Sequence, residues 1–149
     1  MATELKGEGR EVALAEVQAV LALARDEGRR AQLAELVAEI DAGSVDEAEE
    51  LLESVLELAL QTGRIRAYYG PGGEQAALGT LRRLPRGRVR SDSAREVSEA
   101  LRAFAGKQLD AVKIAAVAPG AFTLSIEADG LETSIRLDTS GARIQSVAA

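Results

Sequence analysis

Arginine and tyrosine side chains gather between residues 64 and 90, and of all the residues in this chain they are the best suited to bind an anion or a nucleic acid. Five of the arginines lie within nine residues, from position 82 to position 90. Arginine offers phosphate a planar fork of N–H donors, and aromatic rings stack on bases. The candidate binding residues are Arg64, Arg66, Tyr68, Tyr69, Gly72, Gly73, Arg82, Arg83, Arg86, Arg88 and Arg90.

The glycines of this set belong to the sequence Gly70-Pro71-Gly72-Gly73, which separates a short predicted strand at residues 64–69 from a predicted helix at residues 74–84. A strand, a glycine loop and a helix start together present backbone N–H groups to an anion. The loop lacks the Gly-Lys-Ser/Thr of a P-loop and the glycine spacing of a dinucleotide site. Glu74 also stands where a phosphate would bind. A plain connecting loop is therefore favoured over an anion pocket.

The chain contains neither histidine nor cysteine. It therefore lacks the commonest general base, thiolate chemistry and the commonest transition-metal ligands. Carboxylates, lysines and tyrosines remain, but no spacing among them requires a catalytic role. Glu49, Glu53 and Glu57 recur every four residues, and without a Glu-x-x-His partner we interpret them as a solvated helix face. We expect no catalytic residue, no metal site and no cofactor.

Charge is unevenly distributed along the chain, whose net charge is −6. Residues 1–62 hold fifteen acids and five bases, whereas residues 63–107 hold four acids and ten bases. The basic segment either binds an external anion or pairs with the acidic helices of its own chain or of a partner subunit. Because the chain as a whole repels polyanions, we favour internal pairing.

Four runs of alternating apolar and polar residues fill the last third of the chain, residues 109–147. Three turn signatures separate them, at Pro119-Gly120, Asp129-Gly130 and Ser140-Gly141. A period of two places one set of side chains on a buried face and the other in water. These runs predict an antiparallel meander, and its last strand, residues 142–149, is an edge with a single charge.

The residues before the sheet predict helices. The first covers residues 10–27 with a broad apolar face, and the second ends near Gly43. The capping box that begins at Ser44 predicts the start of the third helix, which ends at Gly63. A second capping box, at Ser93, predicts a helix that covers the sheet and includes Phe104, after a linker at residues 85–92.

Together these patterns predict an α+β fold: a helical N-terminal half, made of an αα-hairpin plus short helices, followed by a helix packed on a four-stranded antiparallel β-meander. Residues 1–9 are expected to be a flexible tail and residues 10–149 a single domain. A boundary within residues 85–92, between a helical part and the αββββ part, is the alternative.

The function predicted from these patterns is a non-catalytic protein-interaction or scaffold domain that self-associates, with a dimer favoured and any other protein partner unspecified. The interface would be the apolar face of the first helix or the last strand. The alternative is a nucleic-acid or phosphate-binding module that uses residues 64–90. No apolar run approaches the roughly 20 residues of a membrane span, and residues 1–10 do not resemble a secretory signal. We therefore expect no membrane association and a cytoplasmic location.

Overall fold

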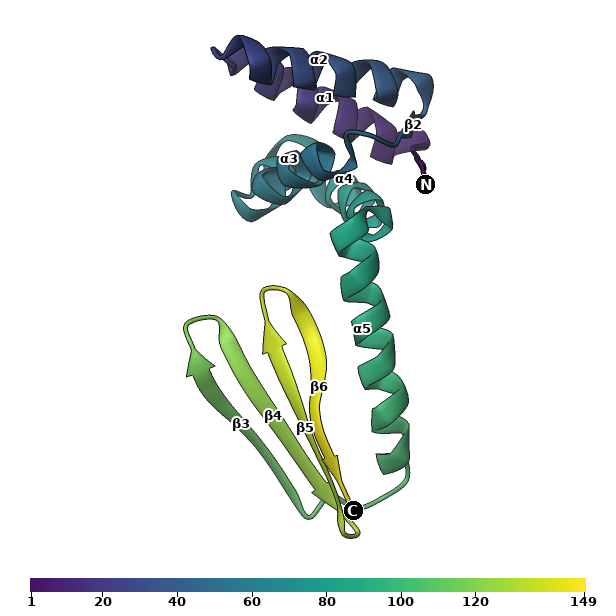
Figure 1. The fold of residues 1–149 in the computed structure, drawn as a ribbon, viewed down its shortest axis with the longest axis vertical. Coiled ribbons are helices and arrows are strands. Elements are labelled where there is room, and N and C mark those ends of the chain that lie inside the picture. Colours follow the sequence, from purple (N-terminus) through teal and green to yellow (C-terminus); the bar gives the residue numbers. More distant parts are fainter. The chain divides into compact units, whose positions relative to one another are not determined.

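The computed structural model describes all residues, 1–149. The chain forms two compact units, Met1–Arg88 and Val89–Ala149, and the division falls within residues 85–92. The first unit is helical, and the second holds a four-stranded antiparallel sheet with its helix. This arrangement confirms the predicted α+β class and the β-meander (Figure 1). None of the helices has the length and apolar character needed to cross a membrane.

Four helices build the first unit: α1 (Gly7–Leu23), α2 (Glu27–Ala42), α3 (Glu49–Gln61) and α4 (Arg64–Arg83). Helix α1 packs against the other three, and α3 also packs against α4. Their facing side chains form one core that includes Val12, Val17, Leu33, Leu36, Ile40, Leu52, Leu56, Ile65, Ala77 and Leu84. Gly9 lets α1 approach α4 closely, because a Cβ atom there would lie 2.6 Å from the Thr80 hydroxyl oxygen.

The first residues of the chain belong to this unit. Residues 1–9, expected to be a flexible tail, contain strand β1 (Thr3–Glu4) and the start of α1. Strand β1 pairs antiparallel with β2 (Ser44–Val45), which places Thr3 opposite Val45. The predicted helix start at Ser44 is wrong, because the backbone there pairs with β1 and is extended; α3 begins only at Glu49.

Residues 64–69 were predicted to form a strand, and that prediction is wrong because they form the first turns of α4. Gly63, with φ of 74°, ends α3 and allows the chain to enter α4 directly. Gly70, with φ of 69° and ψ of −172°, then interrupts α4, and Pro71 restarts it. Proline is favoured at the first position of a helical segment, since the N–H group it lacks has no partner there.

The predicted linker at residues 85–92 is also wrong. Helix α5 (Pro85–Leu101) begins at Pro85 and runs through both units. Ser93, predicted as a helix cap, lies inside α5, where its hydroxyl donates to the Val89 carbonyl, 3.2 Å away. The proline here starts a helix and does not end one, for the reason given for Pro71.

The sheet follows α5 and a short 3₁₀ helix, η1 (Arg102–Phe104). Its strands are β3 (Ala111–Ala118), β4 (Ala121–Ala128), β5 (Leu131–Asp138) and β6 (Gly141–Ala148). They lie side by side in chain order, so β3 and β6 are the edges. The turns match their signatures: Gly120, Asp129 and Gly130 all have positive φ.

The strand register brings the predicted apolar residues together in rows on one face. One row places Ile114 beside Leu124, then Ile135 and Ile144. The rows on either side consist of Val112, Ile126, Thr133 and Val147, and of Ala116, Phe122, Leu137 and Ala142. The alternation predicted from the sequence therefore produces a continuous apolar face across all four strands.

This face is covered unevenly. On β5, Thr133 and Ile135 are each only 1% exposed, whereas on β3 Val112 is 53% and Ile114 is 65% exposed. The unit contains α5 and η1 as its only helices, and their Val97 and Phe104 are buried. A helix is about 10 Å wide, but four strands spaced ~4.8 Å apart span ~19 Å. On β6, Ile144 is 39% and Val147 is 58% exposed. One helix therefore leaves the β3–β4 side of the face bare and the β6 edge only partly covered.

Truncation of two isoleucines in the same row should test this uneven cover. We expect Ile135→Ala to lower the free energy of unfolding by about 2–5 kcal/mol, because it leaves a cavity in the core. Ile114→Ala should cost less than about 1 kcal/mol, because that side chain is mostly in water. Urea denaturation followed by circular dichroism measures both. Equal losses would contradict a half-covered face.

Candidate functional site

The arginines of the predicted binding segment lie on α4 and α5, and three of those in the helical unit face glutamates that are almost fully buried. Glu16, Glu49 and Glu53 are 1%, 8% and 0% exposed. A buried carboxylate without hydrogen-bond donors is strongly unfavourable. Each of these three carboxylates therefore needs the donors that the neighbouring arginines and hydroxyl groups supply.

Glu53 joins α3 to the start of α5. Its Oε2 accepts a hydrogen bond from Arg86 Nε at 3.0 Å, and its Oε1 accepts one from the Gly87 backbone N–H at 3.0 Å. Arg86 also reaches Glu57, 3.3 Å away. The hydrogen bond that Arg86 donates to Glu53 raises the pKa of the Arg86 guanidinium. Only glycine fits at position 87, because a Cβ atom would lie 1.8 Å from the Leu81 carbonyl oxygen.

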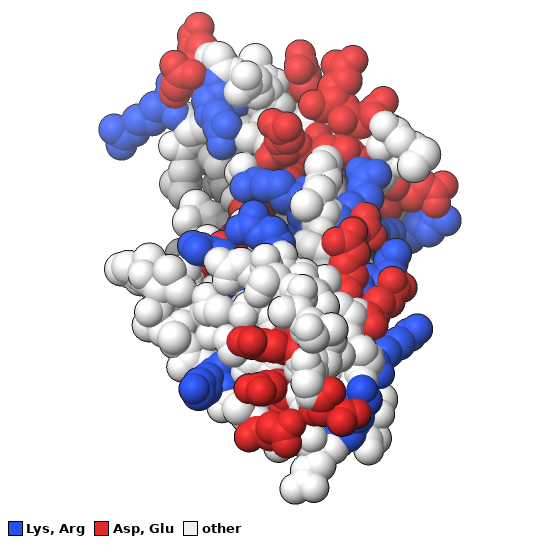
Figure 2. Space-filling model, turned by 60° about the horizontal axis from the view of Figure 1, so that its bottom comes forward, with Lys and Arg blue, Asp and Glu red and all other residues white.

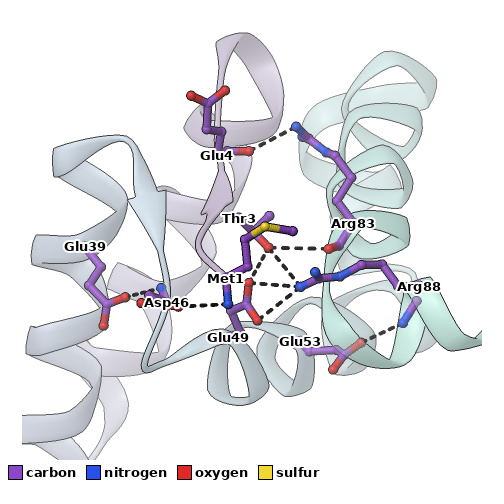
Figure 3. A network of polar contacts seen from close by, with 10 residues as sticks. Met1, Thr3, Glu4, Glu39, Asp46, Glu49, Glu53, Arg83 and Arg88 are labelled. Atoms are coloured by element: carbon purple, nitrogen blue, oxygen red, sulfur yellow. Dashed lines mark hydrogen bonds and ion pairs between the residues drawn. The ribbon is translucent and has the colours of Figure 1, made fainter.

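Glu49 joins α3 to the first strand (Figure 3). The Thr3 hydroxyl donates to its carboxylate, and Arg88 Nη2 lies 3.2 and 3.3 Å from its two oxygens. Arg83 strengthens the same corner, since its Nη1 donates to the Glu4 carbonyl at 3.0 Å. These bonds fix β1 against α3, α4 and the first turn of α5 in the helical unit.

Glu16 joins α1 to the start of α4. Its carboxylate accepts hydrogen bonds from Arg64 Nε at 2.8 Å and from the Tyr69 hydroxyl at 2.9 Å. Burial, and then the hydrogen bond to Glu16, raises the pKa of Tyr69 to about 12. The Glu16 hydrogen bond also raises the pKa of Arg64, and this guanidinium lies over the Tyr68 ring, 4.7 Å from its centroid.

The rest of the predicted set does not gather around these glutamates. Arg66 Nη1 lies 3.9 Å from Glu74 Oε1, which is a long distance for an ion pair, and Tyr68 is 71% exposed. Arg82 is exposed at the end of α4. Arg90 belongs to the other unit, where it lies against Gly141 of β6. The predicted residues therefore occupy separate surroundings along two helices.

The glycine loop proposed as an anion pocket lies inside α4. Gly72 faces Glu8 of α1, whose Oε1 would be 3.7 Å from a Cβ atom at position 72. Gly73 is covered by Tyr69, whose Cβ would be only 2.2 Å from a Cβ at that position. An anion at this restart of the helix would meet the carboxylates of Glu8 and Glu74. The position is thus electrostatically unfavourable for a phosphate.

The buried glutamates are the residues that sequence reasoning missed. The interpretation of Glu49 and Glu53 as a solvated face is wrong, because both side chains point into the helical unit. The missed signal is the helical spacing, since Glu49 and Glu53 share a face with Leu52 and Leu56 at intervals of three and four residues. Glu16 gave the same signal when it interrupted the apolar arc of the first helix.

Further polar side chains lie together in a groove of the helical unit and on the sheet. An open groove of about 450 Å³ lies between α2 and the start of α3, lined by side chains that include Arg29, Glu35 and Glu47. Glu39 in this groove accepts a hydrogen bond from the Asp46 backbone N–H at 2.6 Å. On the polar face of the sheet, hydrogen bonds from Ser140, and then from Arg136, lower the pKa of Asp138. The hydrogen bonds of Glu39 and of Asp138 each stabilise a turn.

Comparisons of the chain with protein-family models, with curated proteins and with solved structures each found no match. The geometry is therefore the basis for any functional conclusion. It assigns Arg64, Arg86 and Arg88 to contacts within the helical unit.

Removal of the Glu53 carboxylate should destabilise the helical unit. We expect Glu53→Ala to lower the free energy of unfolding by about 2–4 kcal/mol, because it leaves the buried Gly87 N–H without an acceptor and opens a cavity. Glu50→Ala, on the exposed side of the same helix, is the matched control and should change it by less than about 0.5 kcal/mol. Thermal and urea unfolding measure both. Similar effects of the two substitutions would contradict the role of Glu53.

The raised pKa of Tyr69 predicts a loss of stability at alkaline pH. Folding favours the neutral phenol, so this contribution is fully present below the unfolded-state pKa, which is close to 10. It is lost as the pH rises towards about 12. In a Tyr68→Phe variant, ultraviolet absorbance reports Tyr69 alone, and we expect its titration midpoint well above 10 while circular dichroism shows a folded chain. A midpoint near 10 in the folded chain would refute the buried contact with Glu16.

Proposed function

We infer that this chain is a non-catalytic protein-interaction domain that self-associates, and that the bare β3 side of the sheet is its binding surface. The observation that carries this inference is the exposure of three large apolar side chains on the β3–β4 side of one sheet face. Val112 is 53%, Ile114 is 65% and Phe122 is 41% exposed. Soluble domains rarely leave such side chains together in water unless they bind a partner.

These side chains adjoin one another. Phe122 pairs with Ala116, two residues from Ile114 on the same face, and Val112 follows two residues further along β3. The β3–β4 half of the face measures about 26 Å by 10 Å, or roughly 250 Å², from the standard strand rise and spacing. Figure 2 shows that the surface of the molecule includes areas without any charged side chain, in addition to groups of acidic and of basic side chains.

The alternative, a nucleic-acid or phosphate-binding module, has less support. The strongest donors of the predicted set, Arg64, Arg86 and Arg88, already hydrogen-bond to carboxylates of the same unit. Binding to a polyanion would have to compete with these contacts and with the net charge of −6. Binding of a protein partner to the apolar face would not have to compete with these contacts or with the net charge.

Self-association through this face should be abolished by one charge placed on it. We expect the wild-type molar mass from light scattering or sedimentation to rise with concentration towards that of a dimer. Ile114→Lys should hold the chain as a monomer, because docking would bury an unpaired ammonium group. The 65% exposure of Ile114 means that the folded chain accommodates the lysine.

Ala115→Lys provides the matched control. It adds the same charge to the same strand, but on the opposite face, where Ala115 pairs with Thr123. We expect the Ala115→Lys chain to dimerise as the wild type does. A wild-type chain that stays monomeric at every concentration, or an oligomer that Ile114→Lys leaves intact, would refute the proposed surface.

A further inference from the structure

We propose that the β3–β4 half-face docks against the same half-face of a second copy of this chain, in a two-fold dimer in which each sheet lies beside the other copy's α5. This proposal rests on the proposed function and adds the partner and the mode of docking. Four observations carry it: the stepped surface beside α5, the sizes of the facing side chains, the charge of this unit, and the area available.

On its β3 side the sheet unit has the shape of a step. Where α5 covers β5, its layer is about 10 Å thick, and where β3 is bare the surface drops to the sheet itself. Two packed sheets are also separated by about 10 Å. A second sheet laid on the bare half therefore lies level with α5 of the first copy. The two-fold axis then runs along the strands, and each β3 edge abuts the α5 helix of the partner.

The side chains on the half-face are complementary in size under this symmetry. With the axis along the strands, each row of one copy faces the same row of the other copy, and β3 of one copy lies over β4 of the other. The row with the largest side chain, Phe122, has the small Ala116 as its β3 member, so each ring meets the partner's Ala116. In the next row Ile114 meets the partner's Leu124. The Phe122 row thus pairs a large side chain with a small one, and the Ile114 row pairs two side chains of similar size.

Charge does not oppose this association. The half-face carries no charged residue, since Lys113 and Glu127 lie on the other face, opposite Ser125 and Ala111. The unit Val89–Ala149 holds eight acids and seven bases, which is close to neutral, whereas Met1–Arg88 holds sixteen acids and eleven bases. Two sheet units can therefore approach with little electrostatic repulsion.

The area suffices for a weak dimer. The half-face contributes roughly 250 Å² per copy. The flank of α5 from Val89 to Leu101, thirteen residues long, contributes roughly another 200 Å² from its rise and width. The total for both copies is about 900 Å², which is slightly below the roughly 1,000 Å² of stable specific interfaces and in the range of weak, transient ones. We expect an interface of this size to form a dimer only at micromolar or higher protein concentrations.

Edge-to-edge pairing of two β3 strands is the competing geometry, because β3 has unpaired backbone groups along one side. The two geometries place residue 115 differently. In the face-to-face dimer the two side chains at position 115 lie on the outer faces of the two sheets and point away from each other. In the edge-paired dimer they lie on the same face of one continuous sheet.

A single spin label distinguishes these geometries, and the absence of cysteine from the chain makes the labelling clean. We would place the label at Ala115→Cys in the full chain and measure the separation between copies by dipolar electron paramagnetic resonance. Face-to-face docking should give more than ~20 Å, since the sheets are ~10 Å apart and the labels point away from each other. Edge pairing should give less than ~15 Å, because paired strands are ~5 Å apart.

The result also separates failure of this geometry from failure of the proposed function. A dimer that Ile114→Lys dissociates, with a label separation of ~20–30 Å, supports face-to-face docking. The same sensitivity to Ile114→Lys with a separation below ~15 Å overturns this geometry but leaves the binding surface in place. Absence of any label coupling at concentrations where the chain is dimeric places the interface elsewhere and overturns both.

Discussion

The width of one helix limits how much of this sheet can be kept from water. Helix α5 is about 10 Å wide, and the four strands span ~19 Å, so roughly half of a continuous apolar face has no cover within its unit. At about 25 cal/mol per Å², a bare area of roughly 250 Å² corresponds to about 6 kcal/mol per copy. Association costs an estimated 4–15 kcal/mol in lost freedom of motion. The two quantities are comparable, which is the condition for reversible docking.

The helical unit, in contrast, buries charged side chains and supplies hydrogen-bond donors to them. Its acidic helices and basic helices come together so that Glu16, Glu49 and Glu53 each receive donors from residues distant in the chain. Pairs of this kind contribute modest net stability, but loss of one partner is costly because the other is then left buried. Three arginines of the segment that resembled a binding surface along the sequence, Arg64, Arg86 and Arg88, therefore join α1, α3 and the starts of α4 and α5 within this unit.

The sheet was predictable because its signals are local. Strict alternation and turns at Gly120, Asp129-Gly130 and Gly141 define strands, faces and register without reference to the rest of the chain. Errors arose where a local signal has two outcomes. Pro71 and Pro85 can end a helix or begin one, and Ser44 can cap a helix or join a strand. The choice depended on tertiary contacts such as the pairing of Thr3 with Val45.

The candidate site was only partly predictable for a related reason. Internal pairing of the basic segment was expected from the charge distribution, but the acidic partners were not identified. A glutamate on a helix is normally solvated, and its burial depends on a donor that arrives from another element. For Glu53 that donor is the backbone of Gly87, thirty-four residues away. Helical spacing alone places Glu53 on the same face as Glu49 and Leu56, but it does not reveal the donor.

The two units differ in how complete their cores are, and this difference favours a partner for the sheet. Fifteen buried hydrophobic residues belong to Met1–Arg88, but only five belong to the 61 residues from Val89 to Ala149. Units of this size with so small a core usually gain stability from a disulfide, a metal or oligomerisation. The chain has no cysteine for the first. Docking of a second sheet would add Val112, Ile114 and Phe122 to the core, so stability of this unit and occupancy of its bare face should be thermodynamically linked.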